Sequence, residues 1–151
     1  MINAYETEDG VVFDMSQLEC DALRSYADGL LTDPEHPFVE LLRSQGLVVG
    51  DAPVPHLAAL LEACAQATKV LTAWVVAPAG CRRVTFFVGP HSAAVLRCDD
   101  GGLYAGEDDP LTVWSIDAEQ LRETFLELSA LGEPSGEGIV PTAVPATLFG
   151  A

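Results

Sequence analysis

The side chains of this chain that could do chemistry are concentrated between residues 81 and 109. Five carboxylates flank the short segment Gly102–Ala105: Asp99, Asp100, Glu107, Asp108 and Asp109. If that segment is one arm of a hairpin, the carboxylates come together, and Ca²⁺ favours oxygen ligands of this kind. Because the spacing of an EF-hand loop is missing, we expect solvent-exposed turns here and no metal site.

A cysteine and a histidine in the same region raise the alternative of a nucleophilic pair. Cys81 and His91 could meet across one hairpin, but only the neighbouring Arg82 and Arg83 would activate the thiol. The two arginines are equally suited to orient a partner's carboxylate. The four cysteines are far apart and form no Cys-x-x-Cys pair, so we expect them to be reduced and buried. Reduced cysteines predict a cytoplasmic protein.

The sequence lacks the common motifs that are typical of enzymes. It contains no Gly-x-Ser-x-Gly elbow, no Walker-type phosphate loop, no His-Glu-x-x-His pair and no Gly-x-Gly-x-x-Gly fingerprint. We therefore expect a non-enzymatic protein with no catalytic residues, no cofactor and no metal. A small hydrolase or transferase remains an alternative, which a perturbed ionisable cluster in a deep pocket would favour.

Charge narrows the range of partners. The chain has 23 Asp and Glu against 7 Lys and Arg, a formal net charge of -16. Nucleic-acid and anionic membrane surfaces attract basic proteins, so neither is an expected partner. The acidity either keeps the protein soluble or matches a basic protein partner. No stretch approaches the roughly 18 apolar residues of a membrane span, and the first ten residues lack the features of a secretory signal.

The central part of the chain has the pattern of an antiparallel β-meander. Short segments rich in β-branched and aromatic residues alternate with Gly, Pro and Asp turns. The expected strands are Val70–Ala77, Arg82–Val88, Ser92–Cys98, Gly102–Ala105 and Leu111–Ile116. With the helices on either side, they predict an α+β fold whose antiparallel sheet has four to five strands.

Four helices are expected around the meander. Ser16 and Glu19 have the spacing of a capping box at the start of a helix over residues 15–28, which Gly29 would end. The others are Pro37–Gln45, His56–Thr68 and a helix capped by Asp117. In that last helix Leu121, Phe125 and Leu128 form an apolar stripe, while Glu119, Glu123 and Glu127 follow the exposed side.

The chain is long enough for a single domain with its own core. We expect that domain over residues 11–145, between a flexible segment, 1–10, and a flexible tail, 146–151. Within 139–144 an edge strand is possible. Both faces of Val70–Ala77 are apolar, which predicts either a central strand or a strand that meets a partner. The residues expected to bind a partner are Trp74, Val76, Arg82, Arg83, Phe87, Asp99, Asp100, Asp108 and Asp109.

In their order, these features resemble one half of the EspG family. The residues that carry the resemblance are Val11–Leu18, Leu42–Leu47, Pro55–Leu60, Arg82–Arg97, Asp117–Leu121 and the Gly/Pro-rich stretch before Val140-Pro141. Members of that family are cytoplasmic chaperones that bind PE-PPE substrates of type VII (ESX) secretion, and they are built from two related halves. The resemblance implies that a single half could form a symmetric homodimer through Val70–Ala77 and His56–Thr68.

The sequence therefore predicts a cytoplasmic chaperone or adaptor that buries an aggregation-prone apolar part of a secretion client. The first alternative is an immunity or antitoxin protein whose acidity neutralises a basic toxin.

Overall fold

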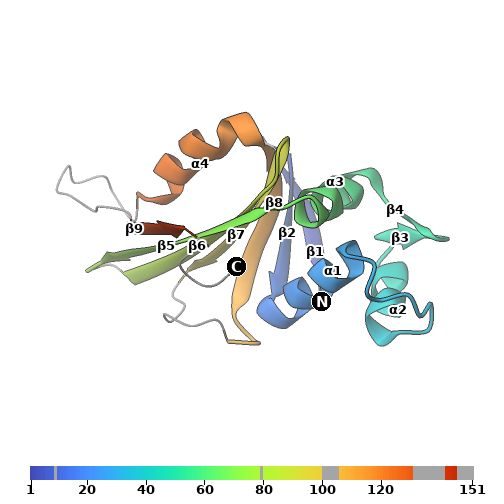
Figure 1. The fold of residues 1–151 in the computed structure, drawn as a ribbon. Coiled ribbons are helices and arrows are strands. Elements are labelled where there is room, and N and C mark those ends of the chain that lie inside the picture. Colours follow the sequence, from blue (N-terminus) through green and yellow to red (C-terminus); the bar gives the residue numbers. More distant parts are fainter. Residues whose placement is uncertain (9, 79, 100–105, 131–141, 146–151) are drawn as a thin grey trace.

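The structure is a computed structural model that describes residues 1–8, 10–78, 80–99, 106–130 and 142–145. Its centre is a seven-stranded antiparallel sheet with helices on both faces (Figure 1). The order of the strands across the sheet is β1-β2-β8-β7-β6-β5-β9. The predicted α+β class, with an antiparallel sheet flanked by helices, is confirmed.

The strands of this sheet follow one another as two antiparallel units. The first is a hairpin of β1 (Asn3–Thr7) and β2 (Gly10–Ser16), and the second is the meander β5 (Lys69–Ala77), β6 (Gly80–Val88), β7 (Ser92–Asp99) and β8 (Pro110–Asp117). Pairing of β2 with β8 joins the two units. The edge strand β9 (Thr142–Pro145) pairs with β5. Two further short strands, β3 (Val48–Val49) and β4 (Ala52–Pro53), form a separate ribbon.

The helices are α1 (Gln17–Ala27), α2 (Pro37–Ser44), α3 (Pro55–Ala65) and α4 (Leu121–Leu128), with a 3-10 turn over Ala118–Gln120 before α4. The predicted capping box at α1 is present: the Glu19 N–H donates to Ser16 Oγ (3.1 Å), and the Ser16 N–H donates to Glu19 Oε1 (3.0 Å). Gly29 follows α1 with φ 73°, the left-handed conformation that glycine adopts without strain.

The larger part of the core lies between α1, α3 and one face of the sheet. Residues one apart on a strand point to opposite faces, so Phe13 of β2, Phe87 of β6 and Val113 of β8 share this side. They pack against Leu23 of α1 and Leu57 of α3. The leucines of α3, Leu57, Leu60 and Leu61, are thus buried within this chain.

A smaller core lies on the opposite face, beneath α4. Val84 and Phe86 of β6 and Val95 of β7 pack there against Phe125 and Leu128. The Phe86 and Phe125 rings are 6.1 Å apart between centroids and tilted by 45°. Since each strand of the meander carries apolar residues on both sides, the sheet requires cover on both faces.

The expectations differ from the structure mainly at the ends of the meander. The N-terminal segment 1–10, expected to be flexible, holds β1 and the first residue of β2. The hairpin of β1 and β2, together with β9, brings the sheet to seven strands, more than the expected four to five. Alternation in this segment is weak because all five residues of β1 are exposed. The predicted strand Gly102–Ala105 lies outside the described residues, as do Asp100 and the tail 146–151.

Candidate binding groove

The two faces of the sheet are covered unequally. In Figure 1, α1 and α3 lie against one face, while α4 crosses the other face on the side of β5 and β6. On that second face, the part of the sheet formed by β1, β2 and β8 therefore lies beyond α4. A groove of about 560 Å³ runs between this part of the sheet and α4.

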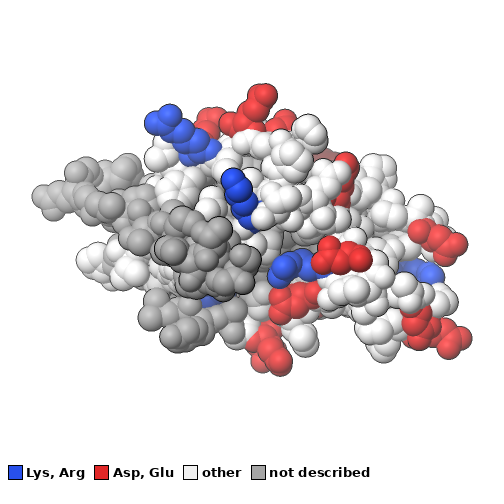
Figure 2. Space-filling view, in the orientation of Figure 1, with Lys and Arg blue, Asp and Glu red and all other residues white. Residues whose placement is uncertain are grey.

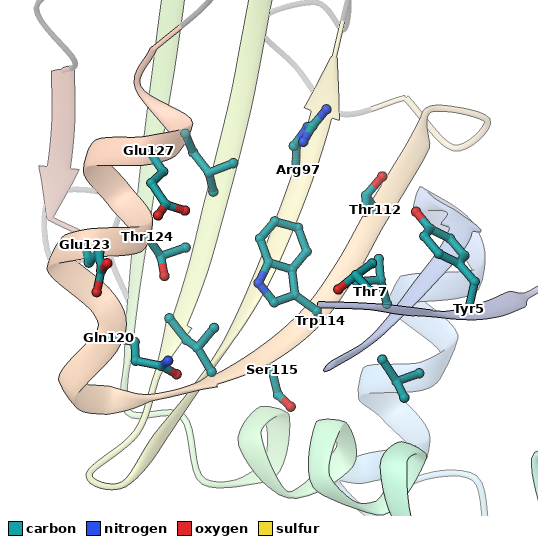
Figure 3. Close-up of a pocket in the computed structure, with 14 residues that line it drawn as sticks. Tyr5, Thr7, Arg97, Thr112, Trp114, Ser115, Gln120, Glu123, Thr124 and Glu127 are labelled. Atoms are coloured by element: carbon teal, nitrogen blue, oxygen red, sulfur yellow. The ribbon is translucent and has the colours of Figure 1, made fainter. Parts of the chain in front are cut away.

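The floor of the groove comes from the strands, and one wall comes from α4 (Figure 3). Trp114 of β8 stands at its centre, half-buried, with its indole between the helix and β1. The polar wall consists of side chains from the 3-10 turn and α4, namely Gln120, Glu123, Thr124 and Glu127. The opposite side is formed by Tyr5 and Thr7 of β1, and Arg97 of β7 lies at one end.

A row of polar contacts separates this groove from a second hollow of about 460 Å³ on the same face. The Tyr5 hydroxyl and the Thr112 hydroxyl both donate to Asp14 Oδ1, each at 3.3 Å. Partial burial and the nearby Asp14 carboxylate raise the pKa of the Tyr5 phenol. Asp14, Asp99 and Asp108 line the second hollow, and Arg97 and Thr112 line both.

Arg97 is held in place by an arginine and aspartate network. Asp99 Oδ2 accepts from Arg97 Nη2 (2.7 Å), and Asp99 Oδ1 accepts from Arg82 Nε (2.7 Å). Burial disfavours the charged form of Asp99, but hydrogen bonds from Arg97 and Arg82 outweigh that effect and hold its pKa below the usual value. Arg82 Nη1 also donates to the carbonyl oxygens of Leu128 and Ala130, so it fastens the end of α4 to the sheet.

The other predicted arginine, Arg83, points to the opposite face and is only 6% exposed. Its Nη2 donates to Asp109 Oδ2 at 3.1 Å. The Gly106 N–H and this guanidinium hold the pKa of Asp109 below its usual value. The same turn supports α1, because the Asp109 and Glu107 carbonyls accept from the N–H groups of Gln17 and Leu18. These acidic residues therefore hold a turn in place.

The predicted partner-binding residues do not form one patch. Phe87 is buried, with the Arg24 guanidinium 4.1 Å above its ring, whereas Val76 is 66% exposed near the end of β5. Trp74 lies on the same side of β5 as Val76 and is half-buried. Arg82 and Asp99 lie on the face that carries the groove, and Asp108 is exposed in the second hollow. In the surface predicted to form a dimer, β5 pairs with β6 and β9, and the leucines of α3 pack inward, whereas Val76 is exposed.

The structure places Cys81 and His91 too far apart for the nucleophilic pair that was considered as an alternative. Cys81 is near the first residue of β6, and His91 follows its last residue. At about 3.3 Å per residue, roughly 20 Å of strand separates them. Among the described residues, no group of three or more His, Cys, Asp or Glu is arranged to hold a metal ion.

Comparison with known proteins found no family model, no curated protein and no solved structure that matches the chain. In the described ranges, no helix is long and apolar enough to cross a membrane.

Sequence reasoning did not single out Tyr5, Trp114, Glu123 and Glu127 as members of one site. A weak signal is present in β8, where Thr112, Trp114 and Ile116 alternate with Leu111, Val113 and Ser115. A tryptophan beside a threonine on one face marks a strand that is only partly covered. Their proximity to the α4 carboxylates depends on where α4 crosses the sheet.

Proposed function

We propose that this chain is a non-enzymatic adaptor or chaperone that binds a protein client, and that the groove beside α4 makes the contact. The observation that carries the proposal is the unequal cover of the sheet, which leaves Trp114 at the floor of an open groove. Partly buried aromatic residues of this kind serve as anchors in protein interfaces, since one part packs and the other part contacts the partner.

On the resemblance to the EspG family, the client is a PE-PPE-like substrate of type VII secretion, and the protein binds it in the cytoplasm. A chaperone of that kind prevents aggregation by covering an apolar part of its client until export. The resemblance supports this assignment by the order of elements: the capped α1, the meander and the Asp117 turn before α4. The groove supplies a surface suited to such a client.

The acidity of the protein favours a second candidate, an immunity or antitoxin protein. Figure 2 shows separate groups of Asp and Glu side chains on the visible face, one of them at the top, over α4, with some Lys and Arg side chains between the groups. A strongly acidic surface accelerates association with a basic toxin and adds to its specificity. This candidate predicts tight one-to-one binding of a single toxin.

Co-expression with the products of neighbouring genes tests the proposal. A chaperone should bring an otherwise insoluble client into the soluble fraction, and size-exclusion chromatography with light scattering should show a defined stoichiometry. An immunity protein should instead abolish the activity of a soluble toxin. Both outcomes should be lost in Thr124→Arg, which places a long side chain in the groove.

The matched control is Val49→Arg, which introduces the same side chain at an exposed position of β3, 69% accessible and far from the groove in sequence and fold. This variant should bind as the unaltered protein does. Equal binding by Thr124→Arg and the unaltered protein would exclude the groove as the client site.

A further inference from the structure

We infer that the groove recognises a cationic side chain, Lys or Arg, which lies beside an apolar residue of the protein partner. The inference rests on the proposed function and names the chemistry that selects the partner. Three features of the described residues support it. They are the charge of the α4 side of the groove, the contacts of most basic side chains with other groups of the same chain, and the position of Trp114.

The wall of the groove carries like charges at helical spacing. Glu123 and Glu127 are one turn apart on α4, and Glu119 lies one turn before them. Carboxylates at positions i and i+4 repel one another across about 6 Å. Both Glu123 and Glu127 are exposed, and neither is a member of an ion pair found among the described residues. A bound cation would remove this repulsion.

Most of the protein's own cations are committed elsewhere. Arg82 and Arg97 share Asp99, and Arg83 binds Asp109. Arg43 donates to the Pro34 carbonyl oxygen, and Arg24 lies over the Phe87 ring. The Arg97 guanidinium at the end of the groove is thus already paired with a carboxylate. The charged side chains that line the groove are Glu123, Glu127 and Arg97, so the lining has a net negative charge.

Trp114 adds a flat apolar surface beside those carboxylates. In Figure 3 the indole lies between Thr124 and Glu127 on one side and Tyr5 on the other. The methylene stem of a lysine or arginine can pack on such a ring while its charged end reaches a carboxylate at the rim. An adjacent apolar residue of the partner then covers the rest of the floor. A second copy of this chain is a poor occupant because each copy has a net charge of -16.

The test uses peptide probes and the two tryptophans of the chain. The probe is acetylated and amidated Gly-Leu-Lys-Leu-Lys-Gly, compared with peptides in which norleucine or glutamate replaces both lysines. Indole N–H signals in ¹H–¹⁵N NMR spectra report binding, and a Trp114→Phe variant assigns them. We expect the lysine peptide to shift the Trp114 signal and leave that of Trp74, on the opposite face of the sheet, unchanged.

Removing the charges of Glu123 and Glu127 should weaken binding of the lysine peptide. Glu123→Gln with Glu127→Gln is expected to lower its affinity about tenfold, whereas the control pair Glu40→Gln with Glu62→Gln should change it less than about twofold. The control alters net charge equally, at exposed positions of α2 and α3. Equal losses in the two double variants, or equal binding of the norleucine peptide, would overturn the inference.

Other outcomes separate this inference from the proposed function. If the natural client is blocked by Thr124→Arg but binds the Glu123→Gln, Glu127→Gln variant normally, cation recognition is wrong and the client site stands. If Thr124→Arg leaves client binding intact, the proposed site itself fails. If spermidine shifts the Trp114 indole signal at a lower concentration than the lysine peptide does, the partner is not a protein. A shift of the same signal on dimerisation of this chain, with no peptide added, would also contradict the inference.

Discussion

Asp99 is the residue on which two strands and one helix depend. It accepts hydrogen bonds from Arg82 and Arg97, and Arg82 extends the connection to the last carbonyls of α4. The network lies beside the groove, so it fixes both the position of Arg97 and the end of the helical wall. The sequence had grouped Asp99 with other carboxylates as turn residues, because nothing local shows which arginines face it.

Substitution Asp99→Asn should lower the free energy of unfolding by about 1 kcal/mol at neutral pH, since it weakens two partly exposed ion pairs. The pKa of Asp99 is lower in the folded protein than its ordinary 3.8. Its contribution is therefore complete above 3.8 and disappears as the pH falls through the lower folded value. Urea unfolding as a function of pH should show the difference from the unaltered protein shrinking in acid.

The control is Asp108→Asn, an exposed residue of the same turn region, which should change stability by less than about 0.5 kcal/mol. If the stability lost in Asp99→Asn did not depend on pH, the side-chain amide would be disturbing packing, and the lost charge would not be the cause.

Cys20 and Cys64 make stability depend on pH in the direction opposite to Asp99. Burial raises the pKa of Cys20 to about 12 and that of Cys64 to about 11, against 9.0 for an ordinary thiol. Above pH 9 the unfolded chain loses these protons while the folded protein retains them, so stability should fall as the pH rises toward 11. The Cys20→Ala, Cys64→Ala variant should show a shallower fall in thermal unfolding experiments across this range.

At the scale of elements, α4 decides whether a groove exists. The helix is short, and its apolar stripe contacts the sheet while the acidic side remains exposed, as the sequence predicted. The capping box of α1 was also predictable, since its partners are three residues apart. Helix ends and amphipathic stripes are local properties, whereas the strand over which a helix comes to lie is determined by contacts distant in sequence.

Substitution Phe125→Ala should cost about 2 kcal/mol because it removes a partly buried ring that packs against Phe86. The neighbouring Leu126 is 55% exposed, so Leu126→Ala is the matched control and should cost less than about 0.5 kcal/mol. Amide hydrogen exchange should increase selectively in residues 121–128 of Phe125→Ala. Equal effects of the two substitutions would mean that α4 is not anchored through this ring.

At the scale of the whole molecule, the net charge of -16 opposes compaction as well as association. The 7 Lys and Arg are already counted in this net charge, so the 23 Asp and Glu determine the sign of the field at longer range. A protein of this kind benefits from salt, because the Debye length decreases from about 30 Å at 0.01 M to about 8 Å at 0.15 M.

Thermal unfolding should therefore move upward by roughly a few degrees between about 0.01 M and 0.2 M NaCl. Potassium chloride at the same ionic strength should give the same shift if screening is the cause. A melting temperature that falls with added salt would show that local ion pairs outweigh the general repulsion.

The sequence by itself determined the meander, the four helices, the capping box and the acidity, because each depends on residue types at short spacing. It did not predict the hairpin of β1 and β2: the residues of β1 are all exposed and lack a clear alternation, and the end of β2 was assigned to the first helix. It also did not show that Phe87 is buried under α1 and α3, or that Trp114 lies beside Glu127. Those placements follow from which face of the sheet each helix covers, and the tertiary structure decided them through packing between segments far apart in the chain.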